Sequence, residues 1–401
     1  MLSSRPREDL AAAMPPTQGL GSIPMQPVPF ARPYLGDREA AAAAEAVKSG
    51  WVVGGPRLAE FEARYAQLCE APYAVGVSSW TTGAFLLLKA WGIGPGDEVI
   101  VPSLTFIASV NVIVHAGATP VFVDIDPETW NIDPDDVERR ITPRTRAIIP
   151  IDQIGLPCDM DRIAAIAKRA NLLVLQDAAC SFGSRYKERP IGAQTSTTVF
   201  SLHARKVVTT GEGGMIVTFD KELAERLRRL RHQGMSLSDF ARHNAPPTLF
   251  ETYPEVGYNF RITDIQAAIG LVQLDKLSEM LELRRRIAQR YLDAIKAIPY
   301  LRGPRIDAGV QPNWQSFQMA LDPGAPVTRD GLMNALHERG IATRRGVMAS
   351  HLEKALEPWR IALPHTEEAA RQCLQLPIFP ALEDGQVERV IAALTDILRT
   401  H

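Results

Sequence analysis

The sequence predicts an α/β protein with a large domain, built on a mostly parallel sheet sandwiched by helices, and a smaller C-terminal α+β domain. From Ala74 onward, short apolar runs alternate with stretches of helical periodicity, a pattern typical of a parallel sheet covered on both faces. Beyond Pro299 the alternation gives way to shorter elements punctuated by Pro and Gly. We therefore expect a flexible tail over residues 1–28, a large domain over 29–278 and a small domain over 279–401.

The elements follow in order along the chain. Residues 11–29 are largely small residues, Pro, Gly and Gln, which predicts a flexible tail. Helices are predicted over 37–49 and 57–69, separated by a turn at residues 54–56. Short apolar runs predict strands, and antiparallel insertions among them stay open. The predicted strands lie at 98–101, 119–124, 147–151, 171–177 and 215–219, and further helices at 84–91, 105–115 and from about 263 into 291.

The composition is that of an ordinary globular chain, with 46% hydrophobic and 22% charged residues among 401. A formal net charge of −2 argues against a dedicated nucleic-acid binder, and no apolar run approaches the ~20 residues that a membrane span needs. Four scattered cysteines show no metal-ligand or disulfide spacing, and a secretory signal is not recognisable. We expect a cytoplasmic protein with no metal, and we interpret Arg284-Arg285-Arg286 as a solvated helix face.

Two residues suit one kind of cofactor chemistry. Asp177 closes an apolar run, and ligands of open α/β sheets bind outside the carboxyl ends of the strands. Lys206 precedes a Gly-rich turn at 211–214, whose backbone can approach another group closely. Chemistry on pyridoxal 5′-phosphate (PLP) needs an amine for a Schiff base and an acid that keeps the pyridine nitrogen protonated. Singly, a residue such as Asp177 is more often a helix cap or surface acid, and one such as Lys206 a basic turn residue, but in this order they suit one PLP cleft.

Neighbouring segments offer the other groups that PLP requires. Residues 77–83 contain two serines and two threonines before an apolar helix. Such a helix start can bind a phosphate or serve as a simple cap. Phe106 follows a predicted strand and could stack on the pyridine ring, although a lone aromatic residue is more often part of a core.

Five segments, in this order and spacing, resemble the DegT/DnrJ/StrS family of PLP-dependent sugar aminotransferases. The resemblance covers nearly the whole chain from about Pro29. It implies the aspartate aminotransferase type fold (fold type I), with a seven-stranded type sheet in the large domain. The segments are residues 51–62 (WVVGGPRLAEFE), 94–133, 176–183 (QDAACSFG), 201–214 and 257–270 (GYNFRITDIQAAIG).

The resemblance implies a role for each matching residue. Lys206 resembles the lysine that forms the Schiff base and Asp177 the partner of the pyridine nitrogen, so these two are the expected catalytic residues. Phe106 resembles the stacking aromatic residue. The other implied cofactor-binding residues are Thr81, Thr82 and Ser201 for the phosphate, Cys180 near the ring oxygen, and Asn259, which resembles a residue that reaches the cofactor of the neighbouring subunit. A homodimer with shared active sites is therefore implied.

The chain departs from the family pattern at several positions. Trp80 stands where the phosphate turn usually has Gly, so its side chain must point away or reshape the pocket mouth. Cys180 replaces a Gln or His that commonly bonds the ring oxygen, and a thiol is a weak donor. These two departures bear on the cofactor and the pocket shape. Asp152-Gln153 replaces a common His-Leu pair, and residues 313–317 replace a His-rich segment, which leaves the sugar acceptor in doubt.

The reaction that the resemblance implies is a ping-pong transamination cycling between PLP and pyridoxamine phosphate (PMP). Glutamate or glutamine would supply the amino group, and a nucleotide-linked keto-sugar would accept it. Lys206 would act as base and acid for the proton shift. Candidates for binding a donor carboxylate or a nucleotide phosphate are Arg261, Arg344 and Arg345, which are equally typical of structural ion pairs.

Three other functions are weighed against this one. The acceptor could be a non-sugar ketone, such as an inosose or a polyketide-derived carbonyl, and Trp80 and Cys180 leave this open. PLP-dependent sugar dehydratases resemble the chain but carry His where Lys206 stands, so Lys206 favours transamination. A non-catalytic relative would be expected to lose Lys206 or Asp177, and both are present.

Overall fold

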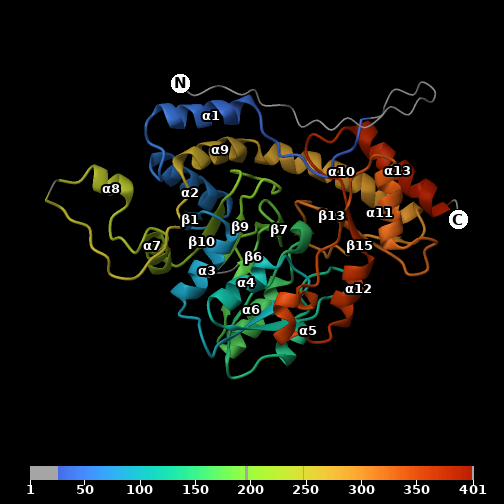
Figure 1. The fold of residues 1–401 in the computed structure, drawn as a ribbon, viewed down its shortest axis with the longest axis horizontal. Helices are drawn as coiled ribbons and strands as arrows, with labels where there is room; N and C mark the ends of the chain where they lie inside the picture. Colours follow the sequence, from blue (N-terminus) through green and yellow to red (C-terminus); the bar gives the residue numbers. More distant parts are fainter. Residues whose placement is uncertain (1–25, 195–196, 247, 400–401) are drawn as a thin grey trace, which may run out of the picture.

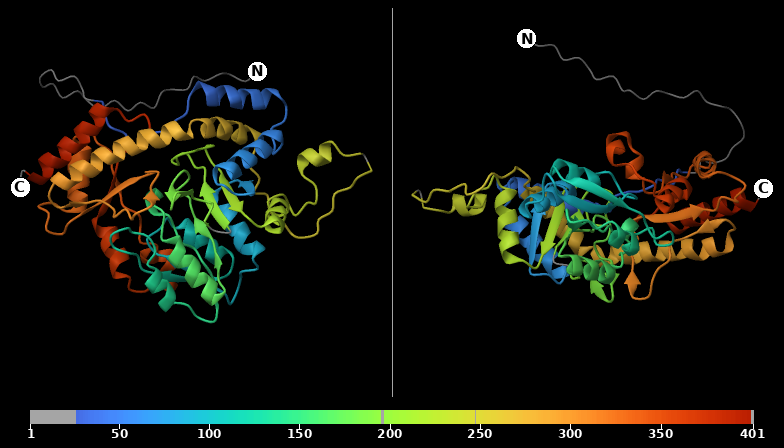
Figure 2. Two further views of the ribbon diagram at one scale, coloured as in Figure 1. Left: turned by 180° about the vertical axis from the view of Figure 1, so that it is seen from behind. Right: turned by 90° about the horizontal axis from the view of Figure 1, so that it is seen from below.

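The computed structural model describes residues 26–194, 197–246 and 248–399. A central sheet lies among helices, and α9 (Asp264–Asp275) and α10 (Leu277–Ala297) run end to end along one side of the molecule (Figure 1). The segment around α8 (Asp239–His243) projects from the body at the opposite end from α13 (Asp384–Arg399) in both broad views (Figures 1 and 2). Among the described helices, none combines the length and apolar character needed to cross a membrane.

The central sheet joins two four-stranded halves through one interrupted strand. β5 pairs with β4, and β6, directly beyond Leu175, pairs with β9. Counted as one strand, they give a seven-stranded order β3-β2-β4-β5/β6-β9-β10-β1 in which β10 is antiparallel to its neighbours and the other pairs are parallel. The mostly parallel sheet expected from the apolar runs is confirmed. The bounds are β1 (Tyr73–Val77), β2 (Glu98–Pro102), β3 (Thr119–Val123), β4 (Thr145–Ile148), β5 (Leu173–Val174), β6 (Gln176–Asp177), β9 (Thr197–Ser201) and β10 (Gly214–Thr218).

The structure corrects three expectations about the helices. α3 (Trp80–Ala90) begins at Trp80 rather than at residue 84, because Ser79 and Thr82 form a reciprocal capping box. α4 (Ala108–His115) begins later than the expected residue 105. The helix expected from about 263 into 291 is two helices, α9 and α10, which meet at Lys276. The remaining helices of the first two thirds are α1 (Asp37–Lys48), α2 (Pro56–Leu68), α5 (Pro134–Arg139), α6 (Met160–Ala170) and α7 (Lys221–Leu230).

The C-terminal part of the chain builds a separate hydrophobic core around a second sheet in the order β11-β13-β15-β14. Val28 is buried in this core and pairs with Ile341. Of the tail expected over residues 1–28, residues 1–25 lie outside the described residues. The elements are β11 (Leu301–Arg302), β13 (Phe317–Leu321), α11 (Arg329–Glu338), β14 (Arg344–Arg345), α12 (Pro364–Gln372) and β15 (Cys373–Leu376), followed by α13.

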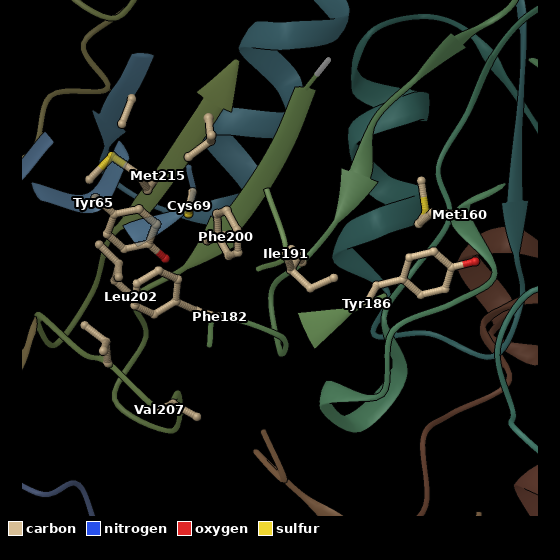
Figure 3. Close-up of a cluster of buried hydrophobic side chains, with 14 of the residues drawn as sticks. Tyr65, Cys69, Met160, Phe182, Tyr186, Ile191, Phe200, Leu202, Val207 and Met215 are labelled. Atoms are coloured by element: carbon tan, nitrogen blue, oxygen red, sulfur yellow. The ribbon is translucent and has the colours of Figure 1, made fainter. Parts of the chain in front are cut away.

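One aromatic cluster anchors the two segments that follow β6 and β9. Tyr65 of α2 stacks on Phe182 with ring centroids 4.1 Å apart, and Phe200 of β9 packs edge-on against both (Figure 3). Leu202 and Val207, on either side of the turn after β9, belong to the same buried cluster. Burial of these large side chains fixes both segments relative to the sheet.

Candidate active site

The expected cofactor residues gather at one edge of the central sheet. Asp177 ends β6, Ser201 ends β9, and the turn into α3 follows the end of β1. β1, β6 and β9 run in the same direction, since β6 is parallel to β9 and both β1 and β9 are antiparallel to β10. Their carboxyl ends therefore meet at the edge where open α/β sheets bind ligands.

Asp177 is a buried carboxylate, 3% exposed. Its Oδ2 accepts a hydrogen bond from Ser109 Oγ at 2.8 Å, and its Oδ1 accepts one from Ala179 N at 3.0 Å. Burial raises the pKa of Asp177 to about 6, although both hydrogen bonds and the charge of Lys206 lower it. Both donors are neutral, so the carboxylate can still gain a charge-assisted bond from a protonated ring nitrogen.

Lys206 lies in a turn after β9 and reaches Cys180. Its Nζ lies 3.2 Å from Cys180 Sγ, and its backbone N donates to the carbonyl oxygen of His203 at 2.9 Å. Asn313, from the C-terminal part of the chain, donates through Nδ2 to the carbonyl oxygen of Cys180 at 2.8 Å. The structure thus brings Lys206 and Cys180 together, close enough to Asp177 for the lysine charge to act on its pKa.

The turn into α3 has the form of an anion site. The hydroxyl of Thr82 accepts a hydrogen bond from Ser79 N at 3.0 Å, so this hydroxyl is engaged in the helix cap. N–H groups of a first helical turn, here including those of Trp80 and Thr81, have no intrahelical acceptor, and together with the helix dipole they favour an anion. Gly214 of β10 packs against this turn, where a Cβ atom would lie 2.5 Å from the Ser79 carbonyl.

Trp80 points away from this anion site. Its indole is buried in the sheet core, and Nε1 donates to the carbonyl oxygen of Val199 at 3.1 Å. The sequence left two possibilities for this bulky side chain, pointing away from the turn or reshaping the pocket mouth, and the structure shows that it points away. Trp80 therefore contributes its backbone N–H to the site and its side chain to the core.

Trp80→Ala should lower the free energy of unfolding by about 3–5 kcal/mol, because it removes a buried indole and leaves a cavity. Trp80→Phe keeps most of the volume and should cost about 1 kcal/mol for the lost Nε1 bond. Urea unfolding measures both values. Near-wild-type stability of Trp80→Ala would show that the indole is not part of the core.

Phe106 and Asn259 lie at the surface of the single chain. Phe106 is 71% exposed at the start of α4, where its carbonyl oxygen accepts a bond from Ser109 N. Such exposure of a large ring fits a residue that a flat cofactor ring would cover. Asn259 is exposed and pairs with His232. None of its described contacts reaches the residues around Lys206.

Asp152 lies behind the site rather than in it. It is fully buried, and burial raises its pKa. Its Oδ2 accepts bonds from Ser181 Oγ at 2.6 Å and Gln176 Nε2 at 3.0 Å, and its Oδ1 accepts one from Cys158 N. These bonds tie down both ends of the turn that carries Asp177. The departure at Asp152 therefore bears on the support of this turn.

Sequence reasoning missed two residues that hold the site. Ser109 bonds Asp177, and its signal was a polar residue one turn after Phe106 in a largely apolar helix. Asn313, almost fully buried, bonds the carbonyl oxygens of both Cys180 and Phe182. No local pattern could reveal this second contact, because it joins distant parts of the chain.

A notable cavity among the described residues does not adjoin Lys206. It has a volume of about 350 Å³ and is lined in part by His232, Asp239 and Arg261. Arg261 lies 2.7 Å from His232 Nδ1 and 3.9 Å from Asp239, so its charge is already partnered. Because no residue of the sheet edge lines this cavity, we place the active site by its chemistry and not by cavity size.

The residues at the sheet edge fit PLP. They supply an amine, a buried acid, an anion-binding turn and an uncovered aromatic ring, the groups that a fold type I PLP enzyme requires.

Comparison with known proteins agrees with this fit. The family model of the DegT/DnrJ/EryC1/StrS aminotransferase family matches residues 33–395. The spore coat polysaccharide biosynthesis protein SpsC of Bacillus subtilis (strain 168) is 39% identical over 378 residues, which cover 93% of this chain and 97% of SpsC.

Solved structures extend the likeness to the fold. S. venezuelae DesV, in complex with a ketimine intermediate, is 36% identical with a TM-score of 0.84, covering 94% of this chain and 99% of DesV. Streptococcus pneumoniae Spr1654 is 28% identical with a TM-score of 0.88 in its PMP form, covering 93% of this chain and 99% of that one, and was also solved in its PLP form. The chain is a PLP-dependent aminotransferase of fold type I. It belongs to the DegT/DnrJ/EryC1/StrS aminotransferase family.

Proposed function

We propose that this aminotransferase moves an amino group from glutamate or glutamine to the keto group of a nucleotide-linked keto-sugar. The observation that carries the proposal is the near full-length likeness to SpsC, a polysaccharide biosynthesis protein, at 39% identity. The burial of Trp80 also supports it, because one of the two departures that left a non-sugar ketone open has its side chain in the core and not at the anion site. Cys180 remains the other departure.

Lys206 and Asp177 are the proposed catalytic residues. PLP, when bound, supplies the electron sink for transamination. Lys206 holds the cofactor through Nζ and, once released, carries a proton between the substrate carbon and the cofactor. Asp177 holds a proton at the pyridine nitrogen, and Ser109 and Ala179 N orient its carboxylate. The low exposure of Asp177 excludes water and strengthens this charge pair.

The remaining site residues are proposed to position the cofactor. The turn before α3, with Thr81 and Thr82, and Ser201 at the end of β9 would hold the phosphate through backbone N–H groups and hydroxyls. Phe106 would cover one ring face. Cys180 would lie beside the ring oxygen, since its Sγ is already in contact with Lys206 Nζ.

A homodimer with shared active sites is proposed as the working form. Asn259 lies at the surface and has no described contact with Lys206 of its own chain, which suits a contribution to a second copy. The projecting segment around α8 (Figure 1) leads back to Asn259 and exposes Phe250, Tyr253 and Val256. Exposed apolar side chains grouped on one segment are typical of an interface.

The acceptor class can be tested by following the absorbance of the bound cofactor. The enzyme is first converted to its PMP form with glutamate, glutamine or alanine, which also reveals the donor. Nucleotide-linked keto-sugars, the matching free keto-sugars and an inosose are then added separately. We expect the visible band of the lysine-bound cofactor to return with a nucleotide-linked keto-sugar. Its return with the inosose alone would instead identify a non-sugar ketone as the acceptor.

A further inference from the structure

Arg284 differs from the two arginines that follow it on α10. Arg285 and Arg286 are exposed and pair with Glu282 and Asp384. Arg284 is 4% exposed, so the interpretation of all three as a solvated face is wrong for this residue. The helical period explains the difference, because adjacent residues on a helix point about 100° apart.

Arg284 is a buried cation without an anionic partner among the described residues. Its Nη1 donates to the carbonyl oxygens of Trp314, Gln315 and Ile378 at 3.0, 3.1 and 3.3 Å. Its Nε has no hydrogen-bond partner, and burial lowers its pKa to about 10. A charge removed from water without a counter-ion is costly. The bonds to neutral carbonyls relieve only part of that cost.

A cavity of about 100 Å³ opens beside Arg284, and we call it the arginine cavity. Arg32, Arg205 and Lys206 line it together with Arg284, and its other lining residues include no carboxylate. The guanidinium of Arg205 packs over the ring of Phe30 at 5.2 Å. None of these arginines forms an ion pair with a carboxylate in the part of the chain that the structure describes. The cavity therefore concentrates positive charge next to the lysine that binds the cofactor.

We propose that the arginine cavity binds one oxyanion group of a substrate, either a carboxylate of the amino donor or a phosphate of the acceptor. Guanidinium groups bind both oxyanions through paired, charge-assisted hydrogen bonds. The volume suits one such group and is well below the ~300 Å³ or more typical of sites for whole drug-sized ligands. This inference rests on one part of the proposed function, namely that the amino donor or the acceptor carries an oxyanion that lies near Lys206 Nζ.

The test measures binding of two unreactive probes to the PLP-loaded protein by isothermal titration calorimetry at low salt. Succinate represents the donor carboxylate, and methyl phosphate represents the acceptor phosphate. Arg205→Gln and Arg32→Gln should each weaken binding of the preferred probe by about tenfold or more, as expected for one lost charge-assisted bond. Arg285→Gln, on the same helix but outside the cavity, is the matched control and should bind like the wild type.

The two probes separate the two sources of the oxyanion. Arginine-dependent binding of succinate identifies the donor, and arginine-dependent binding of methyl phosphate identifies the acceptor. The proposal is overturned if neither probe binds, or if both arginine variants bind like Arg285→Gln. Arg284→Gln is not used because it would also remove three bonds to backbone carbonyls. Failure of every nucleotide-linked keto-sugar in the acceptor screen would leave the succinate result intact, so the two proposals fail separately.

Discussion

Lys206→Ala is expected to abolish the visible absorbance band of the lysine-bound cofactor and to lower turnover by at least about 10⁴-fold, the upper range for loss of a general acid–base group. The variant loses both the amine that holds the cofactor and the group that moves the proton. Cys180, whose Sγ lies 3.2 Å from Nζ, is the nearest replacement. A thiol cannot form the same bond to the cofactor aldehyde.

The measurement is the absorbance spectrum of protein reconstituted with PLP, together with turnover under saturating donor and acceptor. Lys221→Ala is the control, since Lys221 is an exposed residue whose amine lies 3.9 Å from Glu225. It should keep both the band and the rate. A visible band that survives in Lys206→Ala would assign the cofactor to another amine.

Asp177→Asn is expected to reduce turnover by about 10²–10³-fold, the usual cost of removing one preorganised electrostatic group from a buried site. Asn has the same shape, and it can accept from Ala179 N and donate to Ser109 Oγ, so the turn should stay in place. What is lost is the negative charge that keeps the pyridine nitrogen protonated. Affinity for PLP should fall as well.

The same variant should make the cofactor-free protein more stable at neutral pH. The folded pKa of Asp177 is about 6 against an ordinary value of 3.8, so the folded chain holds the proton more tightly than the unfolded chain. The carboxyl therefore contributes stability below pH 3.8 that is lost as the pH rises to about 6. At pH 7.5 the ionised, buried group costs up to roughly 3 kcal/mol.

Unfolding curves of the cofactor-free wild type and of Asp177→Asn at several pH values measure this pH-dependent contribution of Asp177 to stability. We expect the variant to be more stable by about 1–3 kcal/mol at pH 7.5, with the difference closing toward pH 4. Ser109→Ala is the control, because it removes a donor to Asp177 but keeps the charge, and it should lower stability at pH 7.5. A difference that does not change with pH would contradict the role of the buried charge.

Local patterns in the sequence predicted the kinds of residue in the site better than they predicted how those residues are arranged in space. The apolar run ending at Asp177 and the Gly-rich turn after Lys206 predicted a strand-end acid and a loop lysine, and the structure has both at one sheet edge. A seven-stranded sheet was implied only by resemblance, and the order of its strands was not predicted, because strand pairing depends on contacts between distant segments.

Predictions were weakest for side chains that could point either into the core or out of it. Trp80 follows a polar turn, yet it packs inward because its indole fills the sheet core and bonds Val199. Arg284 looked like its exposed neighbours, yet it is buried between α10 and the C-terminal sheet. Both side chains are buried because of the helix face on which they lie. A short stretch of sequence does not show which face of a helix packs against the core.

The sequence by itself predicted the class of fold, the cofactor and the two residues that we propose to serve it, because an amine, an acid and a capped helix start in this order suit PLP chemistry. Only the tertiary structure decided what surrounds them. It placed Ser109 on Asp177, Asp152 behind the turn, and Arg284 beside a cavity lined with positive charge. The physical reason is that burial and charge pairing depend on which distant segments meet, and those contacts form only when the chain folds.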